Sequence, residues 1–313
     1  PHVVVHKTSG RRMGYGEIAA FAQVPAEAPK VSKEMLKPMR QQRLIGKDVP
    51  RVDVPDKVVG RAAYGIDKRL PGMLYGTVMR APVQGEKPEK IDDAAAMKVP
   101  GVVKVVTMPY GVGVIAESYP AARKARAALK VEWSKAAKAR GYNSGQMLAA
   151  YSARGRDLAD GGVEFLKHND AKRAIAGAAK TITAEYTSEH VAHVCMEPMN
   201  ATALVEGDKI EVWAPSQSAF VMNLALMLGL KYKPENIKTN VTLLGGGFGR
   251  RVEADYVVDA AILARAVEGK PVKVIWTRED DIRFDYYHAT AAVYHKAVVD
   301  GRGRVGGRPY EGA

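Results

Sequence analysis

The stretch VTLLGGGFGRR (residues 241–251) decides the fold that we expect for this chain. Residues 237–244 are apolar enough for a strand, and behind the glycines the apolar residues of 253–267 recur at helical spacing. Backbone N–H groups in such a loop can bind an anion, a helix N-terminus favours negative charge, and an arginine can bind phosphate through two hydrogen bonds. The stretch therefore predicts a strand, a glycine loop and a helix, with a phosphate as the expected guest.

Two familiar glycine fingerprints fit this loop poorly. A dinucleotide-binding G-x-G-x-x-G needs glycine where Arg250 stands, and a P-loop needs Lys followed by Ser or Thr where Arg250 and Arg251 stand. A tight glycine turn with an exposed arginine pair is the plain structural alternative. Phe248 within the glycines, and the stop signal of Gly269 and Pro271 behind the helix, favour a binding loop instead.

Charge and cysteine content argue against several classes of protein. The 313 residues carry a formal net charge of +13, but the basic residues are scattered and are not interleaved with aromatics, which argues against nucleic-acid binding. No apolar run approaches the about 20 residues of a membrane span. Cys195 is the single cysteine, so we expect no disulfide within the chain, no iron–sulfur cluster and no metal held directly by protein side chains.

Several stretches together resemble the molybdenum-binding subunit of the xanthine oxidase family of hydroxylases. They are the glycine loop with DYV behind it (residues 255–257) and PVKVIWTREDD (residues 271–281). The paired arginine resembles the branch of isoquinoline 1-oxidoreductase and membrane aldehyde dehydrogenase. YGID (residues 64–67) and LPGML (residues 70–74) resemble the a/b hammerhead domain of that family. The resemblance covers most of residues 45–305.

The expected fold class is α+β, with two domains in sequence. Mixed strands and helices over 49–136 indicate an α+β module, which the resemblance identifies as the a/b hammerhead domain. Residues 1–48 are expected to be an N-terminal arm and linker, and residues 137–168 the connection between domains. Residues 169–313, which open with a predicted helix over 170–178, are expected to be the first half of the molybdopterin-binding α+β domain.

Two further segments are expected to reach the site. HVAHVCMEPMN (residues 190–200) holds a His-x-x-His pair followed by glutamate, but their order and Pro198 argue against a zinc helix and for strand and turn. A strand over 210–215 leads to Gln217, whose amide can present a donor into a cleft without adding charge, or can simply cap the helix predicted over 220–228. By resemblance the site residues are Gln217 as the catalytic group, which donates to an oxo group on molybdenum, and Gly246, Gly247, Phe248, Gly249, Arg250, His193 and Glu197 as cofactor-binding residues.

The resemblance implies a molybdenum hydroxylase that oxidises aldehydes or N-heteroaromatic compounds with water as the oxygen source. Its cofactor would be molybdenum with molybdopterin in the cytosine dinucleotide form, with no iron–sulfur cluster or FAD in this chain. Electrons would pass to a small [2Fe–2S] subunit, with a cytochrome c subunit as a further partner and no nucleic acid. A periplasmic or membrane-associated location is implied, and a cytoplasmic one stays open. A non-catalytic phosphate- or nucleotide-binding module that uses the glycine loop is the alternative.

The sequence departs from the family pattern at two places. Residues 287–289 are Tyr-His-Ala where the branch has an arginine–proline pair. The family's second half of the cofactor domain, with the glutamate that acts as general base, does not follow, so we do not expect Glu311 to be that base. We therefore expect a second polypeptide to supply the rest of the domain, and the chain to be incomplete as an enzyme on its own.

Overall fold

The computed structural model describes residues 3–25, 27–157, 159, 162–163, 171–307 and 310–312. Contacts divide the chain into two units, Pro1–Gly60 and Arg61–Ala313. Part of the predicted interdomain connection, and Asp170 at the start of the predicted helix over 170–178, lie outside the described residues. The division into hammerhead and cofactor domains stays a prediction.

The first unit is a short hairpin followed by isolated helical turns. Its elements are β1 Val3–Val5, β2 Arg12–Gly14, α1 Tyr15–Ala19, η1 Lys33–Met35, η2 Met39–Gln41 and α2 Val54–Val58. None of its described residues is buried, and Phe21 and Met39 are 68% and 72% exposed. Because large apolar side chains stay exposed, the described residues of this unit form no hydrophobic core of their own.

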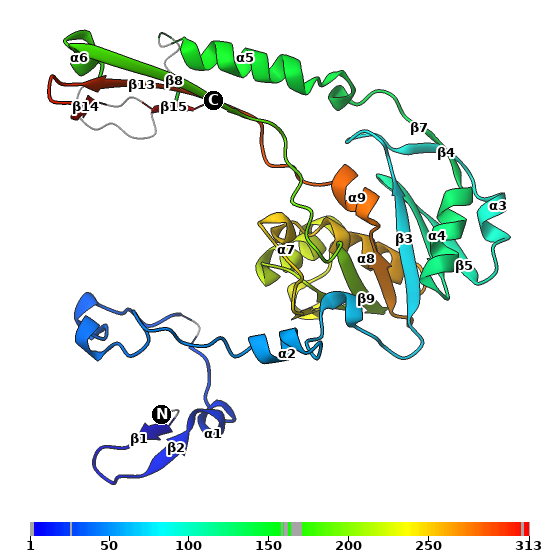
Figure 1. The fold of residues 1–313 in the computed structure, drawn as a ribbon. Helices are drawn as coiled ribbons and strands as arrows, with labels where there is room; N and C mark the ends of the chain where they lie inside the picture. The colour runs from blue at the N-terminus through cyan, green and yellow to red at the C-terminus, as the bar shows by residue number, and fades with distance from the viewer. Residues whose placement is uncertain are drawn as a thin grey trace. The chain divides into compact units, whose positions relative to one another are not determined.

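Seven strands of the second unit form one sheet, in the order β11-β10-β9-β12-β3-β6-β5. Strands β3, β5 and β9 of this sheet are labelled in Figure 1. Their bounds are β3 Leu74–Arg80, β5 Val102–Met108, β6 Gly111–Ala116, β9 Asn200–Glu206, β10 Lys209–Ala214, β11 Ile237–Val241 and β12 Val272–Ile275. The pairs β10–β11 and β12–β3 are parallel, and the other neighbours are antiparallel. Strands of the predicted hammerhead segment therefore continue the sheet of the predicted cofactor segment.

Helix α8 (Asp255–Arg265) packs across this sheet and forms the centre of the core. Its Leu263 is fully buried, which contributes about 1.5–3 kcal/mol. A Cβ at Gly76 or Gly113 would lie 2.7 or 2.4 Å from Leu263, so glycine in β3 and β6 lets the helix approach the strands closely. Helix α7 (Ala219–Leu230), which begins behind the Ser218 cap, packs against α8 and β11.

A buried polar cluster fixes β3 to α8. Asp259 of α8 is fully buried and accepts hydrogen bonds from Arg80 (2.7 Å), Tyr110 (2.8 Å) and Trp276 (3.0 Å). Burial raises the pKa of Asp259, while the charge of Arg80 opposes that rise. Breaking such a buried pair by removing one partner typically costs about 3–5 kcal/mol, a large share of the roughly 5–15 kcal/mol by which a native protein is stable. The cluster thus ties segments far apart in the sequence into one unit.

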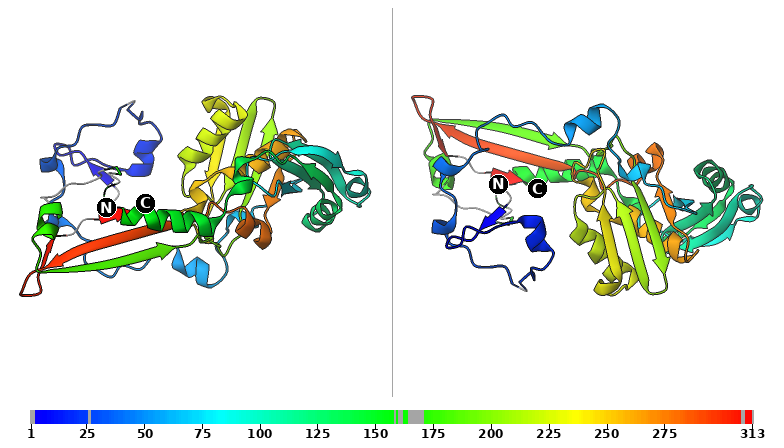
Figure 2. Two further views of the ribbon diagram at one scale, coloured as in Figure 1. Left: turned by 90° about the horizontal axis from the view of Figure 1, so that it is seen from above. Right: turned by 90° about the horizontal axis from the view of Figure 1, so that it is seen from below.

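The remaining elements lie around this sheet and in a second one. They are η3 Gly65–Asp67, β4 Pro88–Asp92, α3 Ala94–Met97, α4 Tyr119–Ala128, β7 Lys130–Trp133, η4 Lys138–Gly141, α5 Ser144–Arg156, α6 Ala171–Ala176, β8 Lys180–Ser188, η5 Pro234–Asn236, η6 Arg250–Val252, α9 Arg278–Arg283, β13 Ala291–Val299, β14 Val305–Gly307 and β15 Tyr310–Gly312. Strands β8 and β13 pair antiparallel along their whole length, with α5 packed against β13 (Figure 2). No helix among the described residues is long and apolar enough to cross a membrane.

Most elements predicted from the sequence are confirmed, with shifted ends. The helices predicted over 253–267 and 220–228 are α8 and α7, and the strand over 237–244 is the shorter β11. The helix over 170–178 is α6, which begins at Ala171. Helices together with a sheet of parallel and antiparallel neighbours confirm the α+β class.

Candidate functional site

The glycine loop runs from the end of β11 to η6 and bends through positive φ angles. Gly246 and Gly249 have φ of 99° and 96°, values that favour glycine. Phe248 between them has φ of 52° with its side chain 71% exposed. Val194, in the segment beside the loop, has φ of 46°, which is an outlier for a β-branched residue. Backbone strain is therefore concentrated around this loop, as it often is at functional sites.

Three consecutive amides of the loop are free to bind a guest. The backbone N–H groups of Gly246, Gly247 and Phe248 have no hydrogen-bond partner among the residues that the structure describes. Successive free N–H groups on backbone of alternating hand form a concave anion-binding site. The loop therefore supplies the donors that the sequence predicted for an anionic group.

Gln217 is held against the loop by its own side chain. Its Oε1 accepts a hydrogen bond from the Gly249 N–H at 3.0 Å. A Cβ at Gly247 would lie 2.6 Å from that Oε1, so only glycine leaves room for the amide. With Oε1 engaged, the amide N–H₂ is the part of Gln217 left to donate, and no hydrogen bond from it occurs within the described residues. The capping alternative is excluded, because Ser218 caps α7.

Glu197 lies beneath the loop. It is 7% exposed, and Oε2 accepts from the Gly245 N–H at 2.8 Å while Oε1 accepts from the Ile66 N–H at 2.9 Å. Arg251 lies 3.2 Å from the same carboxylate. This residue therefore fixes the glycine loop to the 65–68 loop, and does so from inside the protein.

Arg251, which the sequence analysis did not single out as a site residue, holds the loop from below. It is fully buried and donates to the carbonyl oxygens of Gly246 (2.8 Å), Pro215 (3.3 Å) and Glu197. Its own carbonyl accepts from the Gln217 N–H at 3.0 Å. Arg251 thus joins the glycine loop to the segment that carries Gln217. The sequence feature that could have marked Arg251 as a site residue is its place as the second arginine of the pair.

Arg250 lies inside the protein and not at the loop surface, where the sequence analysis placed it. It is 1% exposed and pairs with Asp255 at 2.9 Å and with Asp285 at 2.7 Å. Burial alone would lower the pKa of Arg250, but the two aspartates raise it above its usual value. A direct phosphate contact would need an exposed guanidinium, which this packing does not provide. The sequence predicted a phosphate at the N-terminus of this helix. The carboxylate of Asp255, in the first turn of α8, lies there instead.

His193 lies at the other side of the loop. Its Nδ1 is 3.0 Å from Asp285 Oδ2, and its backbone N–H donates to the same oxygen. A Cβ at Gly249 would lie 3.9 Å from His193 Nε2. The second ring nitrogen therefore faces the glycine loop. Asp285 was not predicted, because nothing local in the sequence marks an acid that pairs so far along the chain.

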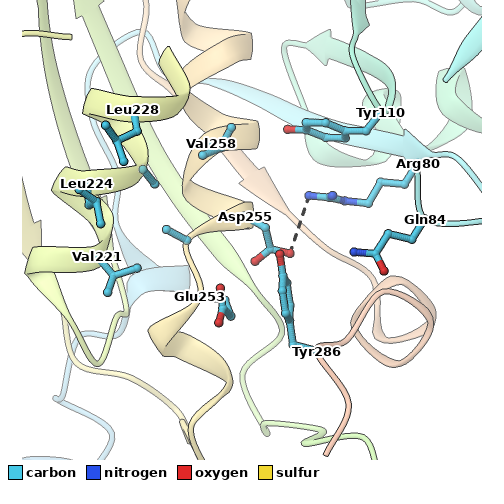
Figure 3. A pocket seen from close by; sticks show the side chains of 12 residues that line it. Arg80, Gln84, Tyr110, Val221, Leu224, Leu228, Glu253, Asp255, Val258 and Tyr286 are labelled. Atoms are coloured by element: carbon cyan, nitrogen blue, oxygen red, sulfur yellow. Dashed lines mark ion pairs between the residues drawn. The ribbon is translucent and has the colours of Figure 1, made fainter. Parts of the chain in front are cut away.

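A separate hollow of about 540 Å³ lies between α7 and β3 (Figure 3). Val221, Leu224 and Leu228 of α7 line one wall, and Arg80 and Gln84 line the facing one. Its lining includes none of the predicted site residues. The structure thus gathers the predicted residues around the glycine loop, with Arg250 and Glu197 behind it, and not in this hollow.

Comparison with known proteins identifies relatives of the chain. Residues 157–309 match the molybdopterin cofactor-binding domain family. The chain is 36% identical to the isoquinoline 1-oxidoreductase subunit beta of Brevundimonas diminuta, over 95% of this chain and 42% of that protein. It is 34% identical to the membrane-bound aldehyde dehydrogenase (pyrroloquinoline-quinone) of Gluconacetobacter polyoxogenes, over 97% of this chain and 40% of that protein.

A solved structure shares the fold. Quinoline 2-oxidoreductase from Pseudomonas putida 86 superposes with a TM-score of 0.67 at 20% sequence identity, covering 87% of this chain and 39% of that chain. The chain spans about two fifths of the length of the curated relatives it matches. By its glycine loop, its fold and these relatives, the chain belongs to the molybdenum-binding subunits of the xanthine oxidase family, in the branch of the isoquinoline 1-oxidoreductase beta subunit and the membrane-bound aldehyde dehydrogenase.

Proposed function

We propose that the chain binds the molybdopterin cofactor with molybdenum in an enzyme that oxidises aldehydes or N-heteroaromatic compounds with oxygen from water. The observation that carries the proposal is the run of three free amides in the glycine loop, directly beside the amide of Gln217. Donors without side-chain bulk suit a guest with anionic oxygens, as a pterin phosphate or an oxo group has. Names of the relatives support both substrate classes equally.

Each site residue has a separate task in this proposal. When bound, the cofactor supplies the redox centre and the Lewis acid for oxygen transfer to an electron-poor carbon. The amides of Gly246, Gly247 and Phe248 would hold its anionic side, and Gln217 would donate a hydrogen bond from its side-chain Nε2. Arg250 and Glu197 act from below the loop, where burial keeps it rigid. The general base would come from another part of the enzyme.

The names of the relatives support the partners and the location that we propose. The isoquinoline relative is named as a subunit, which supports partner chains for this one. We propose a small [2Fe–2S] subunit and a cytochrome c subunit as partners, and the cytosine dinucleotide form of the cofactor. A membrane-bound relative supports a periplasmic or membrane-associated location.

The proposal is tested by the cofactor content of two glycine variants. Gly247→Ala places a methyl group 2.6 Å from Gln217 Oε1, so the Gln217 amide must move away from Gly249 and from its place beside the free amides. Gly229→Ala is the matched control, because a Cβ at Gly229 meets nothing within 4 Å. In the enzyme purified with its partner subunits, elemental analysis should find molybdenum lost from the first variant and retained in the second. Full molybdenum in both variants contradicts the proposal.

The alternative, a phosphate- or nucleotide-binding module, makes a different prediction for the same protein. If the chain is such a module, a free nucleotide binds to it without molybdenum, and Gln217→Ala has no effect on turnover. Under our proposal that variant lowers turnover about tenfold to thousandfold, as loss of an electrostatic donor does elsewhere. The exposed Gln146 provides the control, since Gln146→Ala should leave turnover unchanged.

A further inference from the structure

Asp285 is a buried acid that joins two residues of the site. It follows α9, and its side chain is 1% exposed. Oδ2 faces Nδ1 of His193 at 3.0 Å and accepts from the His193 backbone N–H at 2.5 Å. Oδ1 lies 2.7 Å from Arg250 Nε. One carboxylate therefore fixes a histidine at the loop and an arginine beneath it.

The orientation of His193 follows from these contacts. A carboxylate can only accept hydrogen bonds, so the ring nitrogen that faces it must carry the proton. In the neutral ring the other nitrogen, Nε2, is then a bare acceptor. That nitrogen lies beside Gly249, 3.9 Å from the position of an added Cβ, and the histidine side chain is 15% exposed. An acceptor thus stands next to the three free donors of the loop.

We propose that Asp285 is a positioning residue of the cofactor site: it holds His193 in the Nδ1–H tautomer, with Nε2 presented at the glycine loop as a hydrogen-bond acceptor. The inference rests on the proposed function in one respect only, the identity of the guest: an N–H group of the pterin would donate a hydrogen bond to Nε2. Arg250 strengthens the arrangement, because its Nε lies 2.7 Å from Oδ1 of the same carboxylate and so holds that carboxylate in place. A ring that is already held at Nδ1 loses little further freedom when a guest binds.

The tautomer can be measured on the chain without cofactor. A long-range ¹⁵N–¹H correlation spectrum at about pH 8.5, where an unperturbed histidine is neutral, separates protonated from bare ring nitrogens. The His193 signals are assigned by their loss in His193→Gln. We expect a protonated Nδ1 and a bare Nε2 in the unsubstituted chain. A protonated Nε2 there overturns the inference.

Variants separate a positioning role from a structural one. Asp285→Ala should shift His193 toward the Nε2–H tautomer, whereas Asp285→Asn keeps an acceptor oxygen and should retain Nδ1–H. Asp281→Ala is the matched control, because Asp281 is a buried acid of α9 that pairs with Arg278 and makes no hydrogen bond to His193 within the described residues. If Asp281→Ala moves the tautomer as much as Asp285→Ala does, Asp285 has no specific role.

Cofactor content distinguishes failure of this inference from failure of the proposed function. In the enzyme with its partner subunits, Asp285→Ala should lower bound pterin several-fold and Asp285→Asn should restore part of it. A tautomer that shifts as expected, in an enzyme that never holds molybdenum, would refute the proposed function and leave the role of Asp285 toward His193 intact. Normal pterin content with a shifted tautomer would refute the contact between Nε2 and the guest.

Discussion

Two buried cations, a lysine and an arginine, each hold one of two neighbouring loops through hydrogen bonds to backbone carbonyl oxygens. Lys273 of β12 donates to carbonyl oxygens of the 65–68 loop, and Arg251 donates to carbonyl oxygens around the glycine loop. Glu197 accepts from the backbone of both loops, which lie side by side. The glycine loop therefore lies against the 65–68 loop, which is itself held by the buried charge of Lys273.

The difference lies in the partner of each charge. Arg251 has the Glu197 carboxylate at 3.2 Å, whereas no carboxylate in the described part of the chain lies within ion-pair distance of Lys273. Burial accordingly lowers the pKa of Lys273 to about 8, with Arg69 adding to the effect. An arginine cannot lose its proton in a protein, so the loop at the site keeps its charge at every pH at which the protein is folded. The supporting loop depends on a group that can titrate.

The largest expected effect comes from removing the cation at the site loop. Arg251→Met leaves Glu197 buried without its ionic partner, and we expect a loss of about 3–5 kcal/mol in the free energy of unfolding. Equilibrium urea unfolding followed by tryptophan fluorescence measures it, because all three tryptophans lie in the second unit. Arg123→Met, at an exposed arginine, should change stability by less than about 1 kcal/mol. Equal losses in the two variants would contradict the comparison.

Two glycines, one in each loop, sharpen the comparison at a smaller scale. A Cβ at Gly65 would lie 2.5 Å from Pro215 Cδ, and a Cβ at Gly247 would lie 2.6 Å from Gln217 Oε1. A proline ring cannot move aside, whereas the end of a glutamine side chain can. Gly65→Ala should therefore cost about 1–3 kcal/mol in the free energy of unfolding, and Gly247→Ala clearly less. The same unfolding assay checks the order, and a larger loss for Gly247→Ala would show that the glycine loop is the more rigid of the two.

The sequence predicted the parts of the site that depend on local pattern. The glycines, the strand before them, the helix behind them and Gln217 at the end of a strand follow from spacing and turn chemistry. Contacts between distant segments could not be read in this way. Arg250 looked like a phosphate ligand because its loop is glycine-rich, and only folding brings Asp285 to it. Whether Arg250 binds a guest or a neighbouring acid depends on its burial. That burial arises from packing between segments that are far apart in the sequence, so local pattern does not predict it.

Alkaline pH gives the smallest effect and tests the difference between the two cations directly. The pKa of Lys273 in the folded protein, about 8, lies below the ordinary lysine pKa of 10.5, so the unfolded chain binds more protons between these values. Stability must then rise with pH in this window, because proton release on folding becomes easier. From about pH 7 to about pH 9 the contribution of Lys273 to the free energy of unfolding should rise by about 1 kcal/mol.

Lys273→Met removes the titrating group, so the stability difference between the unsubstituted chain and this variant should move by that amount in favour of the unsubstituted chain. Urea unfolding of both proteins at the two pH values measures it, and other titrating groups cancel in the difference. A difference that stays constant with pH would mean that the three carbonyl oxygens hold the ammonium as firmly as Glu197 holds Arg251, and that the two loops are not distinguished by the charge beneath them.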